Sequence, residues 1–410
     1  MIGPWSHAFP NHSIPGPSVG YLHEALRWWD HWLKGIDTGI MDEPLLRAWM
    51  QGWVDPAPWY AERPGRWVAE TAWPVSRPAR TWWLHGDRVP GLDDTPGDGI
   101  TLRHRGEQAA GLDAGVLCSD GSFGDWPGDQ RAEDGRSLSF TTAVLDAPVE
   151  FLGHPVAHLE VASDRPVAPL IVRLCDVAPE GTSLRVTWGL LELSRRHGME
   201  RSEPMVPGEK ELVAVALKAV GHRFEAGHRI RLGVTTTSWP WVWPAPQPVT
   251  LSLICGPASR LELPTRSRQP EDDRLPALGP PEQLTALPVE TLERRPTSRR
   301  ITQDLATGHA TVVFDWDVGG RTRLPDGLEI DGHNVTTYSI REGDPLTARV
   351  VTEQSQALRR GDDYDVEVQA RGEMTSTIDG FLVTLQLDAC QHGRRMVSRQ
   401  WQLSFPRHGI

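Results

Sequence analysis

Short runs in which apolar and polar residues alternate recur through the middle of the chain, and this pattern limits the possible folds more than any other. Turns rich in glycine and proline separate the runs, and the chain holds 39 glycines and 35 prolines. Such alternation is typical of half-buried β-strands. Seven or more short strands with long returns predict a mainly β protein whose central unit is a jelly-roll β-sandwich. The expected strands are 137–142, 158–162, 170–174, 184–191, 211–217, 229–234 and 249–254.

Weaker signals flank this central series. Residues 86–136 are dominated by Gly, Asp and Pro, and we expect them to form loops. Two brief apolar runs lie ahead of that segment, at 46–50 and 81–84. Four further alternating runs predict a second, smaller antiparallel β unit near the C-terminus. These runs are 310–316, 346–351, 364–370 and 381–387.

One segment, Gly20 to Lys34, is predicted to be helical. Its residues Leu22, Leu26, Trp29 and Leu33 recur at helical spacing and form an apolar stripe, widened by Ala25 and Trp32. Lys34 and then Gly35 are typical of a helix C-terminus. The stripe requires a sheet or another helix to cover it, and nothing before Gly20 in this sequence could do so.

The overall charge and the cysteine pattern exclude several classes of function. The chain has 42 basic and 54 acidic residues, a formal charge of -12, which argues against a general nucleic-acid or anionic-membrane role. Cys118, Cys175, Cys255 and Cys390 lie far apart, without the spacing of a metal knuckle or a disulfide framework. We find neither a secretory signal nor a bilayer-spanning run, and we therefore expect a cytoplasmic location.

The segment Gly3-Pro4-Trp5-Ser6-His7 stands ahead of the predicted helix. In α/β-hydrolases the catalytic residues follow the order nucleophile, acid, histidine, and the histidine lies on a loop before the last helix. His7 fits that final position, where an imidazole acts as general base towards a serine hydroxyl. From spacing alone, a surface-loop histidine without a catalytic role remains the alternative.

The wider sequence resembles the CocE/NonD serine hydrolases, a family that includes cocaine esterase, X-Pro dipeptidyl-peptidases and α-amino-acid ester hydrolases. The resemblance covers about residues 1–265, and its later part is similar to the X-Pro dipeptidyl-peptidase C-terminal domain. It rests on the N-terminal motif around His7 and on the segments Arg27–Pro44, Gly128–Arg131, Val161–Val167, Val172–Val177, Gly227–Gly233 and Trp239–Pro244.

The resemblance implies that His7 is the histidine of a catalytic triad and that the parent enzyme forms an acyl-enzyme from an ester or a peptide substrate. The family's nucleophile elbow, triad aspartate and oxyanion hole would all precede Met1. We therefore expect this chain to be inactive alone, and neither a metal nor an organic cofactor is implied. The expected partner is the missing α/β-hydrolase part, on the same chain or on a separate one.

These expectations divide the chain into four parts. Residues 1–44 would be the end of an α/β-hydrolase domain, with the triad histidine loop and the final helix. Residues 45–265 would hold a connecting segment and the jelly roll. Residues 266–300, which are rich in Pro, Arg and Glu, would form a linker. Residues 301–410 would form the additional β unit.

A second motif, Gly16-Pro17-Ser18-Val19-Gly20, matches the Gly-x-Ser-x-Gly pattern of a nucleophile elbow. An elbow requires a strand leading into the serine, and Pro15 and Pro17 cannot donate ladder hydrogen bonds. We expect Ser18 to lie near the helix N-cap instead, where its hydroxyl would satisfy a free amide.

Other residues with possible binding roles have simpler interpretations. His12, His23 and His31 lack convincing metal-ligand spacing, and Asp93, Asp94 and Asp98 are typical of a solvated turn. The tryptophans Trp239, Trp241 and Trp243, between prolines, could form a platform for an aromatic or proline-bearing ligand. Packing against the missing catalytic part is the alternative.

Two further readings of the chain stay open. A non-enzymatic β-sandwich binding module would hold a peptide or carbohydrate without hydrolysis, although the helical stripe would then be left exposed. One half of a split hydrolase would instead receive its serine and aspartate from a separate chain. The exposed tryptophans are also compatible with a homo-oligomer.

Overall fold

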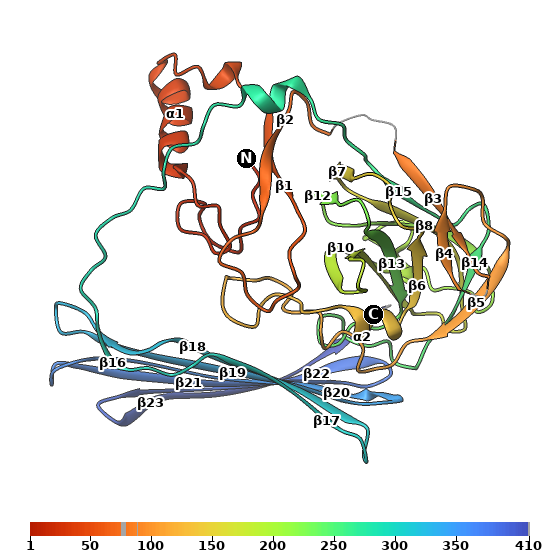
Figure 1. Ribbon diagram of the computed structural model, residues 1–410. Coiled ribbons are helices and arrows are strands. Elements are labelled where there is room, and N and C mark those ends of the chain that lie inside the picture. Colours follow the sequence, from red (N-terminus) through yellow and green to blue (C-terminus); the bar gives the residue numbers. More distant parts are fainter. Residues whose placement is uncertain (75–78, 88, 409–410) are drawn as a thin grey trace.

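The computed structural model describes residues 1–74, 79–87 and 89–408, and within them the chain forms three β-sheets (Figure 1). The N-terminal segment and helix α1 (Tyr21–Lys34) lie to one side of a β-sandwich built from residues 46–263. A broad antiparallel sheet, formed after residue 289, lies beneath both. The predicted mainly β fold with a jelly-roll-type sandwich is confirmed.

Helix α1 has the expected extent but a different N-terminal cap. Its N-cap residue is Gly20, and it ends at Gly35, which has the left-handed φ of 68° that glycine tolerates. The amides of Leu22 and His23 donate to the carboxylate of Glu282, at 3.2 and 2.8 Å. An acidic side chain suits this position because it satisfies free amides and interacts well with the helix dipole.

The capping role expected for Ser18 is therefore wrong. Its hydroxyl donates to the Ser13 carbonyl oxygen at 3.3 Å, and the helix begins three residues beyond it, at Tyr21. The cap comes from Glu282, a residue far away in the sequence, so local sequence rules could not identify it.

The sandwich consists of a four-stranded sheet and a longer, curved sheet. The smaller sheet has the order β2-β1-β12-β7, and the larger has β10-β9-β13-β6-β4-β3-β15-β8-β14-β5, with β11 paired to β8. The strands of the smaller sheet are β1 (Leu46–Gln51), β2 (Gly65–Glu70), β7 (Val149–Gly153) and β12 (Val220–Phe224). Those of the larger sheet are β3 (Arg80–His85), β4 (Gly91–Asp93), β5 (Ile100–Arg105), β6 (Leu138–Thr142), β8 (Val156–Ser163), β9 (Pro169–Val177), β10 (Ser183–Glu192), β11 (Glu211–Ala216), β13 (Arg229–Thr235), β14 (Thr250–Cys255) and β15 (Arg260–Leu263).

One continuous apolar core fills the sandwich. Phe151 and Phe224, from the smaller sheet, are stacked with their ring centroids 5.9 Å apart. They belong to the same buried cluster as Phe140, Leu159 and Leu174 of the larger sheet. Burial of this many large side chains is the main source of the sandwich's stability.

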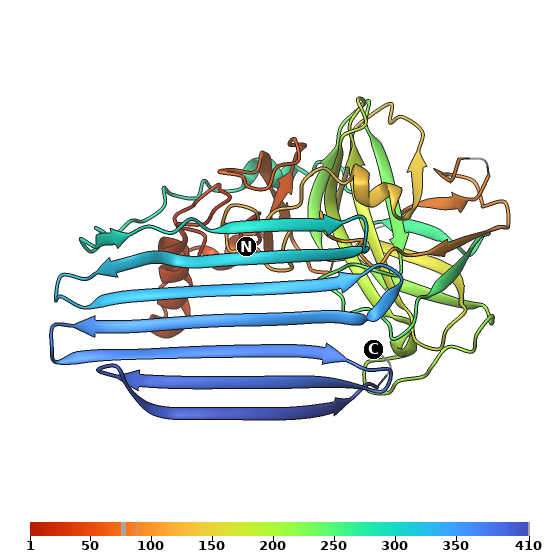
Figure 2. The same ribbon diagram turned by 90° about the horizontal axis from the view of Figure 1, so that it is seen from below.

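The third sheet, which we call the C-terminal sheet, has the order β16-β18-β19-β20-β21-β22-β23. Strand β17 also pairs with β18, on the same side of β18 as β16. Its neighbouring strands are antiparallel throughout, and Figure 2 shows them side by side as one broad layer. They are β16 (Glu290–Glu293), β17 (Ser298–Asp304), β18 (His309–Arg323), β19 (Glu329–Arg341), β20 (Asp344–Arg360), β21 (Tyr364–Ser376), β22 (Gly380–Gln391) and β23 (Arg394–Pro406).

Two tryptophans join the sandwich to the C-terminal sheet. The ring of Trp239 is 1% exposed and lies 6.0 Å from the ring of Tyr338. Trp243 donates from Nε1 to the hydroxyl of Ser376 at 3.0 Å, and its ring packs against Phe381. The ligand platform considered for these tryptophans is thus wrong at Trp239 and Trp243, because they form an internal junction.

Two segments contain more regular structure than their composition suggests. The expected loop 86–136 includes β4, β5 and helix α2 (Arg131–Gly135), and the 266–300 segment includes β16 and the 3-10 helix η3 (Pro270–Arg274). Strand β5 pairs with β14 alone and buries none of its side chains fully, so it carries no apolar signal. The remaining 3-10 turns are η1 (Ile40–Asp42) and η2 (Leu193–Arg195).

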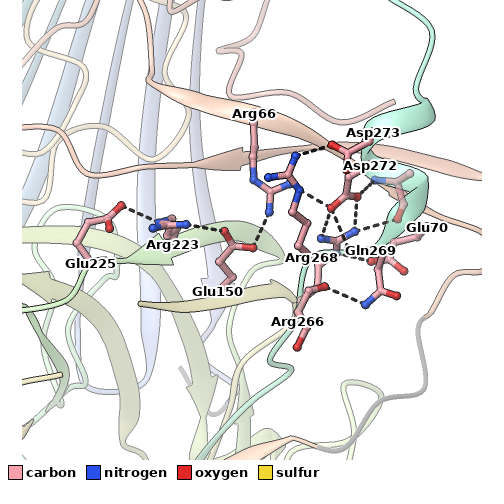
Figure 3. Close-up of polar contacts among 12 residues, drawn as sticks. Arg66, Glu70, Glu150, Arg223, Glu225, Arg266, Arg268, Gln269, Asp272 and Asp273 are labelled. Carbon is pink, nitrogen blue, oxygen red and sulfur yellow. Dashed lines mark hydrogen bonds and ion pairs between the residues drawn. The ribbon is translucent and has the colours of Figure 1, made fainter. Parts of the chain in front are cut away.

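A buried ion-pair network fixes η3 against the smaller sheet of the sandwich (Figure 3). Arg266 is its centre, with a fully buried side chain that donates to Glu70 and to Asp272, at 2.8 Å each. Asp272 also accepts hydrogen bonds from the amides of Ala69 and Gln269. Burial by itself would raise the pKa of Asp272, but these hydrogen bonds outweigh it and lower the pKa from 3.8 to about 2.

This depressed pKa predicts an acid-sensitive contribution to stability. Because the folded pKa lies below the ordinary value, the contribution is complete above about pH 4 and is lost as the pH falls towards 2. We expect Asp272→Asn to lower the free energy of unfolding by roughly 3 kcal/mol at neutral pH, since it removes one of the two carboxylates that pair with the buried Arg266. Urea unfolding at several pH values measures both effects.

Asp273→Asn is the matched control. The neighbouring carboxylate is 62% exposed and pairs with the exposed Arg268, so its loss should cost little. Equal losses of stability for the two variants would contradict the role given to Asp272.

Candidate functional site

The N-terminal segment is attached along the edge of β1. The amide of Ile2 donates to the Arg47 carbonyl oxygen, and the amide of Trp49 donates to the Ile2 carbonyl oxygen, both at 2.9 Å. Trp5 then donates from Nε1 to the Pro17 carbonyl oxygen at 2.8 Å and packs its ring near Trp67. The chain around the predicted catalytic histidine is therefore held at both ends.

His7 lies on an exposed loop, residues 6–14, which we call the His7 loop. Its amide donates to the carbonyl oxygen of Ser119 at 2.8 Å. The hydroxyls of Ser6 and Ser119 lie 3.0 Å apart. Within residues 1–74, 79–87 and 89–408 the His7 imidazole itself makes no hydrogen bond or ion pair, and it is open to solvent.

The segment that holds His7 is a tight loop of the sandwich, residues 119–125, which we call the Ser119 loop. The Asp125 carboxylate accepts from the Ser119 hydroxyl at 3.1 Å and from the amides of Asp120, Gly121 and Ser122 at 3.0–3.1 Å. Burial, and the neighbouring side chain of Asp120, raise the pKa of Asp125 above its ordinary value. One carboxylate thus sets the shape of the whole loop.

Contacts on both sides lock the Ser119 loop in place. Gly121 has a φ of 96°, and a Cβ there would lie 2.8 Å from the Ile14 carbonyl oxygen, so glycine allows the His7 loop to approach. Trp59 donates from Nε1 to the Gly121 carbonyl oxygen at 2.9 Å. On the other side, Arg299 of β17 donates to the carbonyl oxygens of Gly124 and Leu112. The C-terminal sheet therefore contacts the same loop as the His7 segment.

Helix α1 presents an uncovered apolar face beside this region. The predicted stripe is exposed: Leu26 is 57% and Leu33 is 73% accessible to solvent, and none of the helix residues is buried. The helix also borders a cavity of about 630 Å³, lined by Trp28 and Trp29 together with residues of η1. Large exposed apolar faces of this kind mark sites of protein contact or ligand binding.

The structure places the other sequence candidates outside any reactive cluster. The serine of the elbow-like motif, Ser18, bonds to the main chain as described above. A ring nitrogen of His12 lies 3.2 Å from the side-chain oxygen of Asn11, and its ring packs against Phe9. His23 lies 3.7 Å from the carboxylate of Glu282, and the His31 ring packs edge-on against Trp32. Across the described part of the chain, no group of three His, Cys, Asp or Glu side chains is arranged to hold a metal ion.

One buried cluster was not identified from the sequence. Asp176 of β9 accepts from His222 Nε2 at 2.9 Å and from His228 Nδ1 at 2.8 Å, and all three side chains are almost fully buried. The cluster ties β12 of the smaller sheet to the larger sheet. Its members are separated by up to 52 residues, and no spacing rule would have paired them. Because no nucleophile among the described residues is bonded to it, we assign this cluster a structural role.

The arrangement around His7 can supply a general base. An exposed imidazole on a fixed loop can take a proton from a hydroxyl and return it to a leaving group. Within the described residues, no serine or carboxylate is bonded to the His7 ring. Separately, none of the helices in the described part of the chain has the length and apolar content that a membrane span requires.

The β-sandwich is of the class found as the C-terminal domain of hydrolases of the CocE/NonD type. Residues 38–258 match the family described as "X-Pro dipeptidyl-peptidase C-terminal non-catalytic domain". This match covers more than half of the chain, and the chain belongs to that family.

Individual relatives agree with this assignment. A Mycobacterium bovis protein named "Putative serine esterase" is 28% identical over 270 residues, which cover 57% of this chain and 40% of the relative. Cocaine esterase of Rhodococcus is 25% identical, over 58% of this chain and 44% of that enzyme. A solved aminopeptidase from a marine sediment archaeon has a similar fold over 65% of this chain and 49% of its own, with a TM-score of 0.52 and 18% identity.

The chain spans less than half the length of these curated relatives. Their names describe esterase and peptidase activities of longer proteins. The shared conclusion for this chain is that it is the C-terminal domain of a hydrolase.

The hydrogen bonds of the Ser119 loop predict how the His7 loop responds to mutation. Removing the Asp125 carboxylate with Asp125→Ala takes away four acceptor contacts, and the loop should then release the amide of His7. We expect that amide to exchange with solvent deuterium at least about tenfold faster, since a lost hydrogen bond costs roughly 1–3 kcal/mol. Asp55→Ala, at an exposed carboxylate, is the control, and unchanged protection in Asp125→Ala would refute the link.

Proposed function

We propose that this chain is the C-terminal part of a serine hydrolase that cleaves ester or peptide bonds, and that His7 is the histidine of its catalytic triad. The observation that carries the proposal is the combination at the N-terminal end: an exposed imidazole on a fixed loop beside an uncovered apolar helix face. Both features require a second body, which would bring the serine to the histidine and cover the helix.

In this proposal His7 acts twice during one catalytic cycle. Its ring nitrogen takes the proton from the serine hydroxyl as the serine oxygen bonds to the substrate carbonyl carbon. The resulting imidazolium then gives that proton to the leaving alcohol or amine as the old acyl bond breaks. In the second half His7 takes a proton from the water that attacks the acyl carbon. It then gives that proton to the serine oxygen as the bond to the acyl group breaks and the acid is released.

The partner that supplies the serine is, in our proposal, an α/β-hydrolase body that packs on α1. It would belong to the same polypeptide or to a separately encoded chain. The substrate would be a small acyl ester or a peptide, and no metal or organic cofactor takes part in the proposed reaction. The exposed face of α1 favours this function over a solitary binding module, which would leave that face in water.

A reducing compartment fits the proposal. All four cysteines are free thiols, and Cys118 is exposed, as the cytoplasm would keep it.

The first prediction concerns the chain by itself. We expect the purified 410-residue chain to hydrolyse a chromogenic acyl ester no faster than its His7→Ala variant. A histidine without a nucleophile and an oxyanion hole lacks the two largest contributions to acyl transfer. Turnover by the chain that His7→Ala abolishes would contradict the proposed need for a second body.

The second prediction concerns the protein isolated from its source cells with an antibody against residues 45–265. A band well above 45.6 kDa would place serine and histidine on one polypeptide, and a band at 45.6 kDa with a co-purifying hydrolase chain would show a split enzyme. In either assembly we expect ester or peptide hydrolysis that His7→Ala reduces on the order of 10⁴-fold or more, mainly in kcat.

His12→Ala is the matched control, because His12 is an exposed histidine on the same loop. It should leave kcat within about twofold of the parent protein, as surface substitutions do. Equal losses for the two histidine variants, or no hydrolysis by the isolated assembly, would overturn the catalytic assignment.

A further inference from the structure

The outermost strand of the C-terminal sheet has no partner on its free side. Strand β23 pairs with β22 along one side, and Figure 2 shows it at the sheet margin farthest from β18. Every residue of the thirteen-residue strand is exposed to solvent. Its free backbone amides and carbonyls can therefore pair with another extended strand.

Between Val397 and Phe405 the apolar side chains of the strand lie on one face, which also carries Arg399. Val397, Trp401, Leu403 and Phe405 are 41–49% exposed and alternate with polar residues. The register pairs Trp401 with Leu385 and Phe405 with Phe381, and Phe381 in turn contacts Trp243 of the sandwich. The apolar face of β23 thus belongs to the same face of the C-terminal sheet that the sandwich covers at Phe381, through Trp243.

The sequence of this strand is nearly symmetrical about Trp401. Residues 397–405 read Val-Ser-Arg-Gln-Trp-Gln-Leu-Ser-Phe. Gln400 and Gln402 are equidistant from the centre, as are Ser398 and Ser404. Apolar residues occupy both ends.

Symmetry of this kind suits a strand that pairs antiparallel with its own copy. With a twofold axis at Trp401, each residue lies opposite the residue equally far on the other side of the centre. Trp401 then faces Trp401 of the second copy, and Gln400 faces Gln402. Aromatic cross-strand pairs are among the favourable ones, and amide side chains can bond to one another on the other face.

The charges allow this pairing. The only charged residue between Val397 and Phe405 is Arg399, which would lie opposite Leu403 of the second copy rather than opposite another arginine. Residues 397–405 hold no proline or glycine, and Arg399 is their one charged residue. The features of β23 that would hinder pairing, namely Arg394, Arg395, the β-bulge at Met396 and Pro406, lie outside this segment. A twofold dimer requires a self-complementary patch, and this edge meets that condition.

We propose that β23 is a dimerisation edge, at which two copies of this chain join their C-terminal sheets into one continuous sheet across Trp401. This interface goes beyond the hydrolase function and does not depend on it. It uses a part of the chain outside the matched family region, residues 38–258.

The test measures the mass of the purified chain in solution by light scattering and sedimentation over a range of concentrations. We expect a reversible dimer of twice 45.6 kDa. Trp401→Lys, and separately Trp401→Glu, should each weaken dimerisation at least about a hundredfold, because each places like charges face to face at the axis. An equimolar mixture of the two variants should restore the dimer, since opposite charges then meet there.

Trp28→Lys is the matched control, since Trp28 is a similarly exposed tryptophan on α1. It should leave the dimer intact, and circular dichroism should show that all the variants stay folded. The amides of residues 397–405 should also become protected from hydrogen exchange as the concentration rises. A monomer at every concentration, a dimer that Trp401→Lys leaves unchanged, or a dimer lost in Trp28→Lys would each overturn the proposal.

Discussion

A β-sheet with one apolar face is stable only when a second layer covers that face, and this constraint organises the whole chain. In the sandwich the two sheets cover each other, and Phe151 and Phe224 lie at the centre of their shared core. At the junction with the C-terminal sheet the cover comes from Trp239 and Trp243. At each of these contacts, separating the two layers would expose apolar surface to water.

The same constraint identifies the surfaces that remain open. The apolar face of α1 and the apolar side of β23 have no cover within the described residues. They differ in what they offer to a partner. The helix offers side chains alone and suits a body with its own apolar surface, whereas the strand edge also offers backbone hydrogen-bonding groups in a symmetrical register.

The position of the candidate catalytic histidine also depends on tertiary structure. His7 lies on a loop with no regular structure of its own, and its position is set by the Ser119 loop of the sandwich and by the carboxylate of Asp125. Through Arg299 the same loop also contacts the C-terminal sheet. The β-sandwich domain therefore holds in place a histidine that we assign to catalysis. This gives a physical reason for the histidine and the domain to share one chain.

The sequence predicted the elements that carry a strong periodic signal and the family motifs around them. The stripe of α1 was visible because its apolar residues recur at helical spacing, although none of them is buried. The runs of β8, β9 and β13 were visible because these strands are rich in buried apolar residues. Exposed edge strands such as β5, and the short strands of the 266–300 segment, gave no such signal. They are held by backbone pairing, which does not require a particular side-chain pattern.

By itself, the sequence determined the fold class, the extent of α1 and the candidacy of His7, since periodicity and motif are local properties of the chain. Only the tertiary structure decided what holds the elements and loops in place: the cap from Glu282, the Arg266–Glu70 pair and the loop contact at Ser119. These interactions join residues up to 260 positions apart. Local sequence rules cannot find them, because the partners meet only after the layers have packed.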